Sequence, residues 1–243
     1  MIRISTNHIT LITDPKVVAI PIRDLQEPLI DLRETSDIFI GPSPEIENNM
    51  HYTYMRYTVY KKLKEAQTRL PHKIFFCLYE AYRTPELQKQ LFESHLKHTQ
   101  QRHPTWRLDE CFKEATKLLS PMTHLDGSIN IPPHSTGGAL DLYLVNQHGE
   151  HLEMGIHPKD WMQDADAILS MTQSEHISLE AQKNRHLMSR ALSSVGFVNY
   201  PTEYWHWSYG DRYWAYAKHR PYAIYGTTYV NGQSNQPIHL KDN

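Results

Sequence analysis

Two residues of types that bind metal ions, His134 and Asp141, lie seven positions apart where a loop leads into a predicted strand. Two prolines directly before His134 disfavour a helix, and two glycines after it let the backbone approach a neighbouring segment closely. If the loop folds back onto the strand, the imidazole and the carboxylate can meet, and a metal ion is a partner that both accept. Because the chain has 16 histidines, the spacing alone is weak evidence, and the glycine-rich entry into a strand is what favours a metal site.

The strand after this loop is indicated by alternation that begins at Ala139. Leu140, Leu142 and Leu144 point to one face, which is predicted to pack in the core. Asp141 points to the opposite face, where a buried carboxylate without a partner would be costly. The pattern therefore predicts both a core face and a partner for Asp141.

A second polar group lies in a predicted strand near residue 205. Trp205 and Trp207 share one face, predicted to be core, and His206 points to the other face, toward the same cleft as Asp141. Glu203 precedes His206 by three positions, so it reaches the cleft only if it lies in the preceding turn. The alternative is structural: a salt-bridged glutamate and a core histidine beside two tryptophans.

Together, His134, Asp141 and His206 supply three nitrogen or oxygen ligands, which is the number typical of a catalytic rather than a structural zinc site. A water bound to such a zinc has its pKa lowered to about 7. Glu203 can then remove a proton from that water as a general base. Arg83 can stabilise negative charge as it develops on a carbonyl oxygen.

Arg83 lies between two predicted elements, an apolar strand over 73–79 and a helix from Pro85 to about Thr99. Thr84 is predicted to cap this helix, with Pro85 in its first turn. Junctions of this kind often carry functional side chains, and the alternative is an ordinary surface arginine.

The remaining pattern predicts a mixture of helices and extended segments. Residues 1–50 are punctuated by prolines and expected to be extended, with a strand over 17–22. Apolar residues at helical spacing predict helices over 50–70 and 179–195, the second ended by Gly196.

The length of 243 residues suits a single domain, predicted to span 1–226. Residues 100–130 are interpreted as a possible lid or insertion, and 227–243 as a polar C-terminal tail. The formal net charge of −2 gives no indication of nucleic-acid binding, and two cysteines exclude a disulfide framework. The sequence does not indicate an oligomeric state.

The N-terminus has no apolar run of signal-peptide length, and no segment approaches the length of a membrane span. The expectation is a soluble protein in the cytoplasm, although a periplasmic protein without its leader would look the same.

Three motifs in this order resemble those of a known family over residues 50 to 210. They are Tyr82-Arg83-x-Pro85, His134-x-x-Gly137-x-Ala139-x-Asp141 and Glu203-x-Trp205-His206. The family is that of the D-alanyl-D-alanine dipeptidases of the vancomycin-resistance type. These are zinc peptidases related in fold to D,D-carboxypeptidases and to the hedgehog signalling domain.

The resemblance implies an α+β fold whose central antiparallel sheet carries a zinc site and is flanked by helices. It implies one zinc ion per chain, with His134, Asp141 and His206 as its ligands. It also implies that Glu203 is the base, that Arg83 stabilises the tetrahedral intermediate, and that Asp160 receives the free amino group of the substrate. The chain departs from the family at Pro132, where relatives often have serine, and at Glu34, where they often have tyrosine.

Three functions follow from these observations. The first is zinc-dependent hydrolysis of D-Ala-D-Ala or a similar D-amino-acid dipeptide. The second is a D,D- or L,D-carboxypeptidase acting on peptidoglycan peptides. The third is a zinc-bearing binding module without enzymatic activity, which has no need of a base at Glu203. Whether the role is antibiotic resistance, use of D-alanine as a nutrient or turnover of the cell wall is left open.

Overall fold

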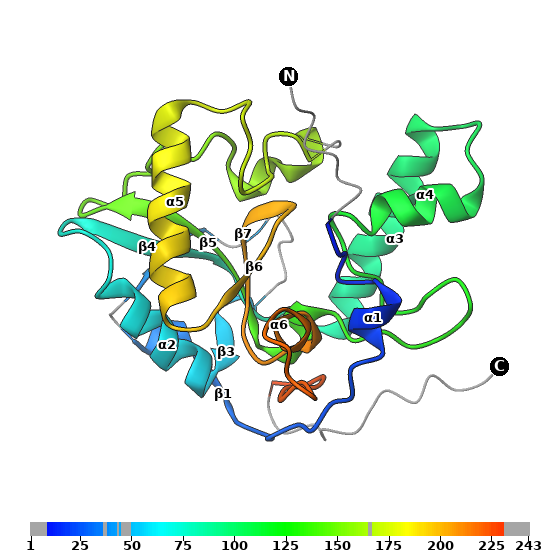
Figure 1. Cartoon of the computed structure of the whole chain (residues 1–243), viewed down its shortest axis with the longest axis horizontal. Coiled ribbons are helices and arrows are strands. Elements are labelled where there is room, and N and C mark those ends of the chain that lie inside the picture. The colour runs from blue at the N-terminus through cyan, green and yellow to red at the C-terminus, as the bar shows by residue number, and fades with distance from the viewer. Residues whose placement is uncertain (1–8, 36–37, 43, 45–49, 165–166, 231–243) are drawn as a thin grey trace.

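A five-stranded sheet forms the centre of the protein in this computed structural model, which describes residues 9–35, 38–42, 44, 50–164 and 167–230. Its strands follow the spatial order β2-β4-β5-β7-β6 (Figure 1). Their bounds are Phe39–Ile40 for β2, Ile74–Glu80 for β4, Ala139–Asn146 for β5, Glu203–Ser208 for β7 and Val198–Tyr200 for β6.

The sheet is antiparallel in all its pairs except one. Strands β4, β5, β7 and β6 pair antiparallel with their neighbours, whereas the short edge strand β2 runs parallel to β4. With helices around it, this sheet gives the α+β fold that the sequence predicts. The pairing also places Glu80, Asp141 and His206 opposite one another across three neighbouring strands, because Asp141 pairs with both of the other residues.

Two helices, α2 (Tyr57–Gln67) and α5 (Leu179–Ser194), pack together beside the sheet (Figure 1). Their buried residues and the leucines of β5 belong to one core cluster, as the alternating pattern predicts. Ser178 caps α5 by accepting a hydrogen bond from Ala181 N–H, and the chain leaves the helix at Gly196 with a φ of 99°.

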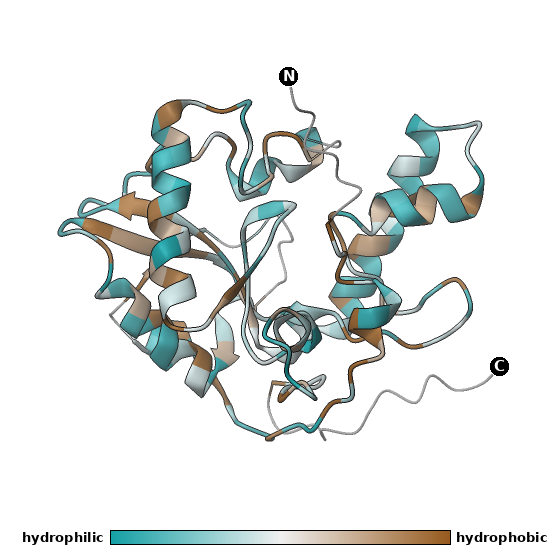
Figure 2. Cartoon of the chain, in the orientation of Figure 1, coloured by the Kyte–Doolittle hydropathy of each residue, from teal (hydrophilic) through white to brown (hydrophobic). Residues whose placement is uncertain are grey.

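On the other side of the molecule lie α3 (Pro85–Arg102) and α4 (Leu108–Ala115). Thr84 caps α3 through a hydrogen bond from Leu87 N–H to its side chain, as predicted. These helices form their own small apolar cluster from Phe92, Ala115 and Leu119. Figure 2 shows that α3 and α4 carry more hydrophilic residues than β4, because only one narrow face of each helix is buried.

The N-terminal part is less extended than predicted. Its elements are α1 (Pro15–Val18), β1 (Leu29–Asp31), the 3₁₀ helix η2 (Leu32–Glu34) and β3 (Tyr54–Arg56), and β1 pairs with β3 in a separate two-stranded sheet. The strand predicted over 17–22 is therefore wrong, because α1 extends to Val18 and only Ile22 of this stretch forms an isolated bridge. The helix predicted from residue 50 begins only after β3. Residues 1–8, 36–37, 43 and 45–49 of this part lie outside the described residues.

The C-terminal part continues beyond β7 with α6 (Arg212–Ala217). Packed chain extends to Thr228, which is buried, donates its N–H to Ser135 O at 3.0 Å and accepts a hydrogen bond from Tyr82 Oη at 2.6 Å. Residues 231–243 of the predicted tail lie outside the described residues. Among the helices that the structure describes, none combines the length and apolar character needed to cross a membrane.

Candidate active site

The loop that carries His134 is a 3₁₀ helix, η3 (Pro133–Thr136), that ends at Gly137 with a φ of 70°. Any other residue at position 137 would have to adopt this left-handed conformation, which is unfavourable for residues with a side chain. At position 138, the Cβ of any other residue would lie 2.5 Å from Tyr209 O. The two glycines therefore allow the loop to turn sharply and pack against the chain that follows β7. This is the close backbone approach that their presence in the sequence predicts.

The ring of His134 is oriented by a hydrogen bond to the backbone carbonyl of Ala81. Its Nδ1 lies 2.6 Å from Ala81 O, and because a carbonyl oxygen can only accept, Nδ1 must carry the proton. The other nitrogen, Nε2, then has a free lone pair directed into the site. This is the arrangement expected of a histidine that binds a metal ion.

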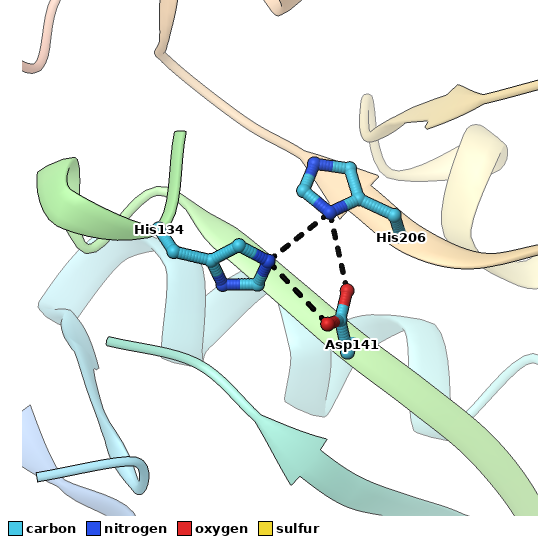
Figure 3. Close-up of side chains that lie close together, drawn as sticks. All are labelled: His134, Asp141 and His206. Carbon is cyan, nitrogen blue, oxygen red and sulfur yellow. Dashed lines mark hydrogen bonds and ion pairs between the residues drawn. The ribbon is translucent and has the colours of Figure 1, made fainter. Parts of the chain in front are cut away.

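Asp141 and His206 complete a compact group with His134 (Figure 3). The His134 Nε2 atom lies 3.2 Å from His206 Nδ1 and 3.4 Å from Asp141 Oδ2, and His206 Nδ1 lies 3.1 Å from Asp141 Oδ1. All three residues are buried, and their candidate ligand atoms lie within 4.8 Å of one another. The second nitrogen of His206 faces Ser208 Oγ at 3.5 Å, so the two histidines direct different ring nitrogens to one point.

Electrostatics in this group favour an ionised carboxylate at Asp141 beside a neutral ring at His206. Burial alone would raise the pKa of Asp141, but the neighbouring His134 and His206 outweigh burial and hold that pKa below its ordinary value. Burial lowers the pKa of His206, and Asp141 only partly opposes this shift. A deprotonated carboxylate and a neutral imidazole are the forms that bind metal ions.

Glu203 is the first residue of β7, yet its carboxylate lies on the same side as His206, with Oε2 at 3.9 Å from His206 Nδ1. In a regular strand, side chains three positions apart point to opposite faces. The sequence analysis therefore predicts that Glu203 lies in a turn. Instead, the pairing of β6 with β7 shifts register between Asn199 and Tyr200. The resulting bulge, rather than a turn, brings the carboxylate into the cleft.

The pKa of Glu203 is raised well above its ordinary value, first by burial and then by the charge of Asp141, with Arg83 opposing both. A carboxyl group with a raised pKa takes up a proton more readily, which suits a general base at neutral pH.

Arg83 follows β4 and is buried, with 7% of its surface exposed, which excludes the surface arginine. Its Nη2 donates to Glu80 Oε2 and its Nη1 donates to Gln88 Oε1 at 2.9 Å. Gln88 Nε2 in turn donates to Ser120 O at 2.6 Å. Burial would lower the pKa of Arg83, but Glu80 raises it, so the guanidinium stays charged.

Glu80 and Gln88 are site residues that the sequence analysis missed. Glu80 could have been found as a carboxylate that ends an otherwise apolar strand three positions before Arg83. Gln88 gives no signal, because a glutamine in the second turn of a polar helix is ordinary.

A cavity of about 140 Å³ connects these groups, and Glu80, Arg83, His134, Asp141, Glu203 and His206 all line it. The cavity is also lined by residues from 116–120, after α4, and from the 3₁₀ helix η4 (Pro158–Gln163). We call these two segments the roof. The roof residues that line the cavity are Thr116, Leu118, Leu119, Ser120, Pro158, Trp161 and Met162.

The structure does not bring Asp160 together with the other predicted site residues. Asp160 belongs to η4, between roof residues that line the cavity, but its own side chain is not part of the lining. Its Oδ1 accepts a hydrogen bond from Gln163 Nε2 at 3.2 Å. Its role toward the substrate stays a prediction.

Comparison with known proteins adds an independent line of evidence. A family model described as D-Ala-D-Ala dipeptidase matches residues 56–227. A D-alanyl-D-alanine dipeptidase of Synechocystis sp. is 31% identical over 107 residues, which cover 39% of this chain and 43% of the relative. A protein of the same name from Escherichia coli is 35% identical over 75 residues, which cover 30% of this chain and 35% of the relative. The matches thus span less than half of either curated relative.

Two solved structures show distant similarity to this chain. VanYB in complex with D-Ala-D-Ala has 12% identity and a TM-score of 0.40, covering 69% of this chain and 79% of that one. A variant of the D,D-pentapeptidase VanY in complex with Zn(II) has 11% identity and a TM-score of 0.43, covering 84% of this chain and 90% of that one.

Proposed function

The chain belongs to the D-Ala-D-Ala dipeptidase family, and from that membership we propose that it uses one zinc ion to hydrolyse D-Ala-D-Ala or a similar short D-amino-acid dipeptide. The observation that carries the proposal is the convergence of three ligand atoms, a raised-pKa carboxylate and a buried guanidinium on one small cavity.

His134, Asp141 and His206 would hold the zinc. Two imidazole nitrogens and one carboxylate oxygen are ligands that zinc accepts, and three protein ligands are typical of its catalytic sites. The hydrogen bond from His134 to Ala81 O supports this assignment, because it leaves the ligand nitrogen of that ring unprotonated. When bound, zinc supplies a Lewis acid that polarises the scissile carbonyl and makes water a better nucleophile at neutral pH.

Glu203 acts as the general base in this proposal. Its carboxylate lies beside the ligand atoms of His206 and Asp141, so a water that attacks the peptide carbonyl from this side is within its reach. The carboxylate removes a proton from that water, and the carboxyl group then returns a proton to the leaving amine.

Arg83 stabilises the negative charge that develops on the carbonyl oxygen. Glu80 and Gln88 hold its guanidinium in one orientation, so the charge is directed at the cavity before the substrate enters. Such preorganised charge contributes most in a site from which water is largely excluded.

The size of the cavity supports a dipeptide as substrate. A volume of about 140 Å³ leaves room for a few small groups beside the candidate ligand atoms, and the mostly apolar roof lines the same cavity. Small side chains such as the methyl groups of alanine fit this enclosure better than an extended peptide does. We assign recognition of the substrate ammonium to Asp160, because η4 borders the cavity on both sides of this residue.

The experiment that tests the proposal compares D-Ala-D-Ala with N-acetyl-D-Ala-D-Ala and with a longer peptidoglycan peptide ending in D-Ala-D-Ala, each with zinc supplied. We expect release of D-alanine from the free dipeptide and at least about 100-fold lower kcat/KM for the other two. Preference for the longer peptide would identify a carboxypeptidase instead. No hydrolysis of any of the three by zinc-loaded protein would favour a binding module.

A further inference from the structure

We propose that Asn199 is a positioning residue for the reaction, and that its side-chain amide sets the distance between the base Glu203 and the ligand His206. The inference rests on the proposed function for the roles of these two residues. That the Asn199 amide fixes their relative positions does not depend on that function. Asn199 lies in β6, and its amide forms hydrogen bonds with backbone groups of β7 and with one side chain of a neighbouring loop.

The bulge in β7 opposite Asn199 contains several unpaired residues. On β6, Asn199 pairs with Trp207 and the next residue, Tyr200, already pairs with Glu203. Three residues of β7, 204–206, therefore have no pairing partner on β6. Without this bulge, Glu203 and His206 would point to opposite faces of the sheet, because side chains alternate along a strand.

The Asn199 amide fills the place of the missing pairing. Its Nδ2 donates to Glu203 O at 3.0 Å and to His206 O at 3.0 Å, and Tyr204 O lies at 3.4 Å. A single side chain thus binds the peptide carbonyls at both ends of the Glu-x-x-His segment. By binding both carbonyls, the amide fixes the spacing of the two backbone positions from which the proposed base and the proposed metal ligand extend.

A neighbouring loop holds the amide in the required orientation. Thr172 Oγ1 donates to Asn199 Oδ1, which directs the NH₂ group toward the carbonyls. The orientation is unambiguous because carbonyl oxygens can only accept hydrogen bonds. The same loop pairs with the bulged segment through Thr172 N–H to Pro201 O at 3.0 Å and Tyr204 N–H to Ser170 O at 2.8 Å.

Aspartate at position 199 keeps the shape of the side chain but has no N–H group to donate at neutral pH. It would place a negative charge against three carbonyl oxygens, so the bulged segment would move away from it. Thr172→Val is a milder change, since it removes only the donor that orients the amide. Asn146→Asp is the matched control, because Asn146 also donates its amide and lies at the opposite end of β5 from Asp141.

The test measures kcat and KM on D-Ala-D-Ala, the zinc dissociation constant by chelator competition, the visible spectrum of the cobalt-substituted protein and the thermal midpoint for all three variants. Residues that orient metal ligands affect metal affinity or activity by about 10- to 100-fold, so we expect Asn199→Asp to lower kcat and weaken zinc binding within this range. KM should change far less, because binding of the dipeptide does not depend on where the base lies. Thr172→Val should shift the same quantities in the same direction, and Asn146→Asp should leave them unchanged.

The proposal is overturned if folded Asn199→Asp and Thr172→Val both keep kcat per bound zinc, zinc affinity and the cobalt spectrum of the parent while only the thermal midpoint falls. That result would make Asn199 a residue of general stability. If the parent protein does not hydrolyse the dipeptide, the proposed function fails, but zinc affinity and the cobalt spectrum still decide the role of Asn199. An unfolded Asn199→Asp leaves the decision to Thr172→Val.

Discussion

The metal corner, by which we mean His134, Asp141, Glu203 and His206, and the roof are built by different means. The metal corner stands on paired strands and on a loop clamped against them, within the main core of the molecule. The roof consists of a loop after α4 and of η4, and it packs on α3 through a small apolar cluster that includes Leu119 and Trp161. Strand register fixes the first region, whereas loop packing fixes the second.

The chemical character of the two regions differs in the same way. Charged and titratable groups fill the metal corner, and most cavity-lining residues of the roof are apolar. Bond cleavage needs groups held at defined distances, which paired strands provide. Selection of a substrate needs only a surface of suitable shape, and loops can change shape without disturbing the sheet. Substitutions in the metal corner should therefore change kcat, and those in the roof should change which substrate is accepted.

The largest effect should come from the proposed ligands themselves. Replacing His134 by alanine removes one of the three proposed ligands, so zinc affinity should fall by more than the about 100-fold that loss of a supporting residue costs, and activity should fall with it. Metal content after dialysis measures this directly. His148→Ala, on an exposed turn, is the control. Full zinc content in His134→Ala would remove His134 from the ligand set.

Glu203→Gln should separate chemistry from metal binding. Glutamine keeps the size of the side chain but cannot accept the proton, so kcat should fall by about 10²- to 10⁴-fold while zinc content is unchanged. Steady-state kinetics and metal analysis measure the two quantities. Glu180→Gln on the exposed start of α5 should behave as the parent does. Loss of zinc along with activity would show that Glu203 supports the metal rather than the proton transfer.

Arg83→Lys tests whether catalysis needs the fixed orientation of the Arg83 guanidinium or only its positive charge. A lysine keeps the charge but cannot bind Glu80 and Gln88 at once, so kcat should fall by up to about 10²- to 10³-fold, with a smaller change in KM. The exposed Arg69→Lys is the control. Normal turnover in Arg83→Lys would assign the arginine to structure alone.

Asp160→Asn tests whether the roof selects the substrate. Loss of a charge-assisted hydrogen bond of about 1.5–3 kcal/mol should reduce kcat/KM for free D-Ala-D-Ala by about 10- to 100-fold. The N-acetylated dipeptide has no ammonium group, so its lower rate should not change. Equal losses on both substrates would count against Asp160 as the ammonium partner.

A last effect concerns stability rather than activity, and it is a pH dependence that arises where α3 packs against the roof. Burial lowers the pKa of His95 from 6.5 to about 4, with His98 and Arg102 adding to the shift, and its ring packs against Trp161 of the roof at 4.9 Å. The unfolded chain therefore binds the proton more tightly, so stability is full above pH 6.5 and is lost as pH falls toward 4. The slope should approach about 1.4 kcal/mol per pH unit within that window.

Urea unfolding of His95→Gln across this window measures the effect. The variant should lose this part of the pH dependence, whereas His98→Gln should keep it. An unchanged slope in His95→Gln would show that the ring is already protonated or exposed in the folded protein.

Local signals explain which elements could be predicted from the sequence. Thr84 before Pro85 gave the start of α3, Gly196 marked the end of α5, and the alternating leucines of β5 gave its core face. The strand predicted over 17–22 is wrong because Asp14 caps a short helix that Pro15 begins, and local capping outweighs the preference of valine for strands.

The geometry of the site depended on contacts that a sequence pattern does not contain. The sequence could bring Glu203 to the cleft only by a turn, since a bulge depends on the register of β6 and on the amide of Asn199. The pairing of Glu80 with Arg83 could have been inferred from their spacing, but its burial could not. The orientation of Asp160 depends on η4, where the neighbouring Gln163 provides a local partner that competes with the cavity.

The buried guanidinium of Arg56 has a consequence for the order in which this protein folds. It donates to Thr136 O in the loop that carries His134, and also to Glu27 O and Gly226 O, across 80, 29 and 170 positions of the chain. Contacts between such distant segments form late, because closing long loops costs entropy before any contact compensates for it. The loop that carries His134 therefore gains its final support only when the segment around Gly226 has docked. We expect refolding from denaturant to show a slow phase, and zinc to be acquired in that phase rather than earlier.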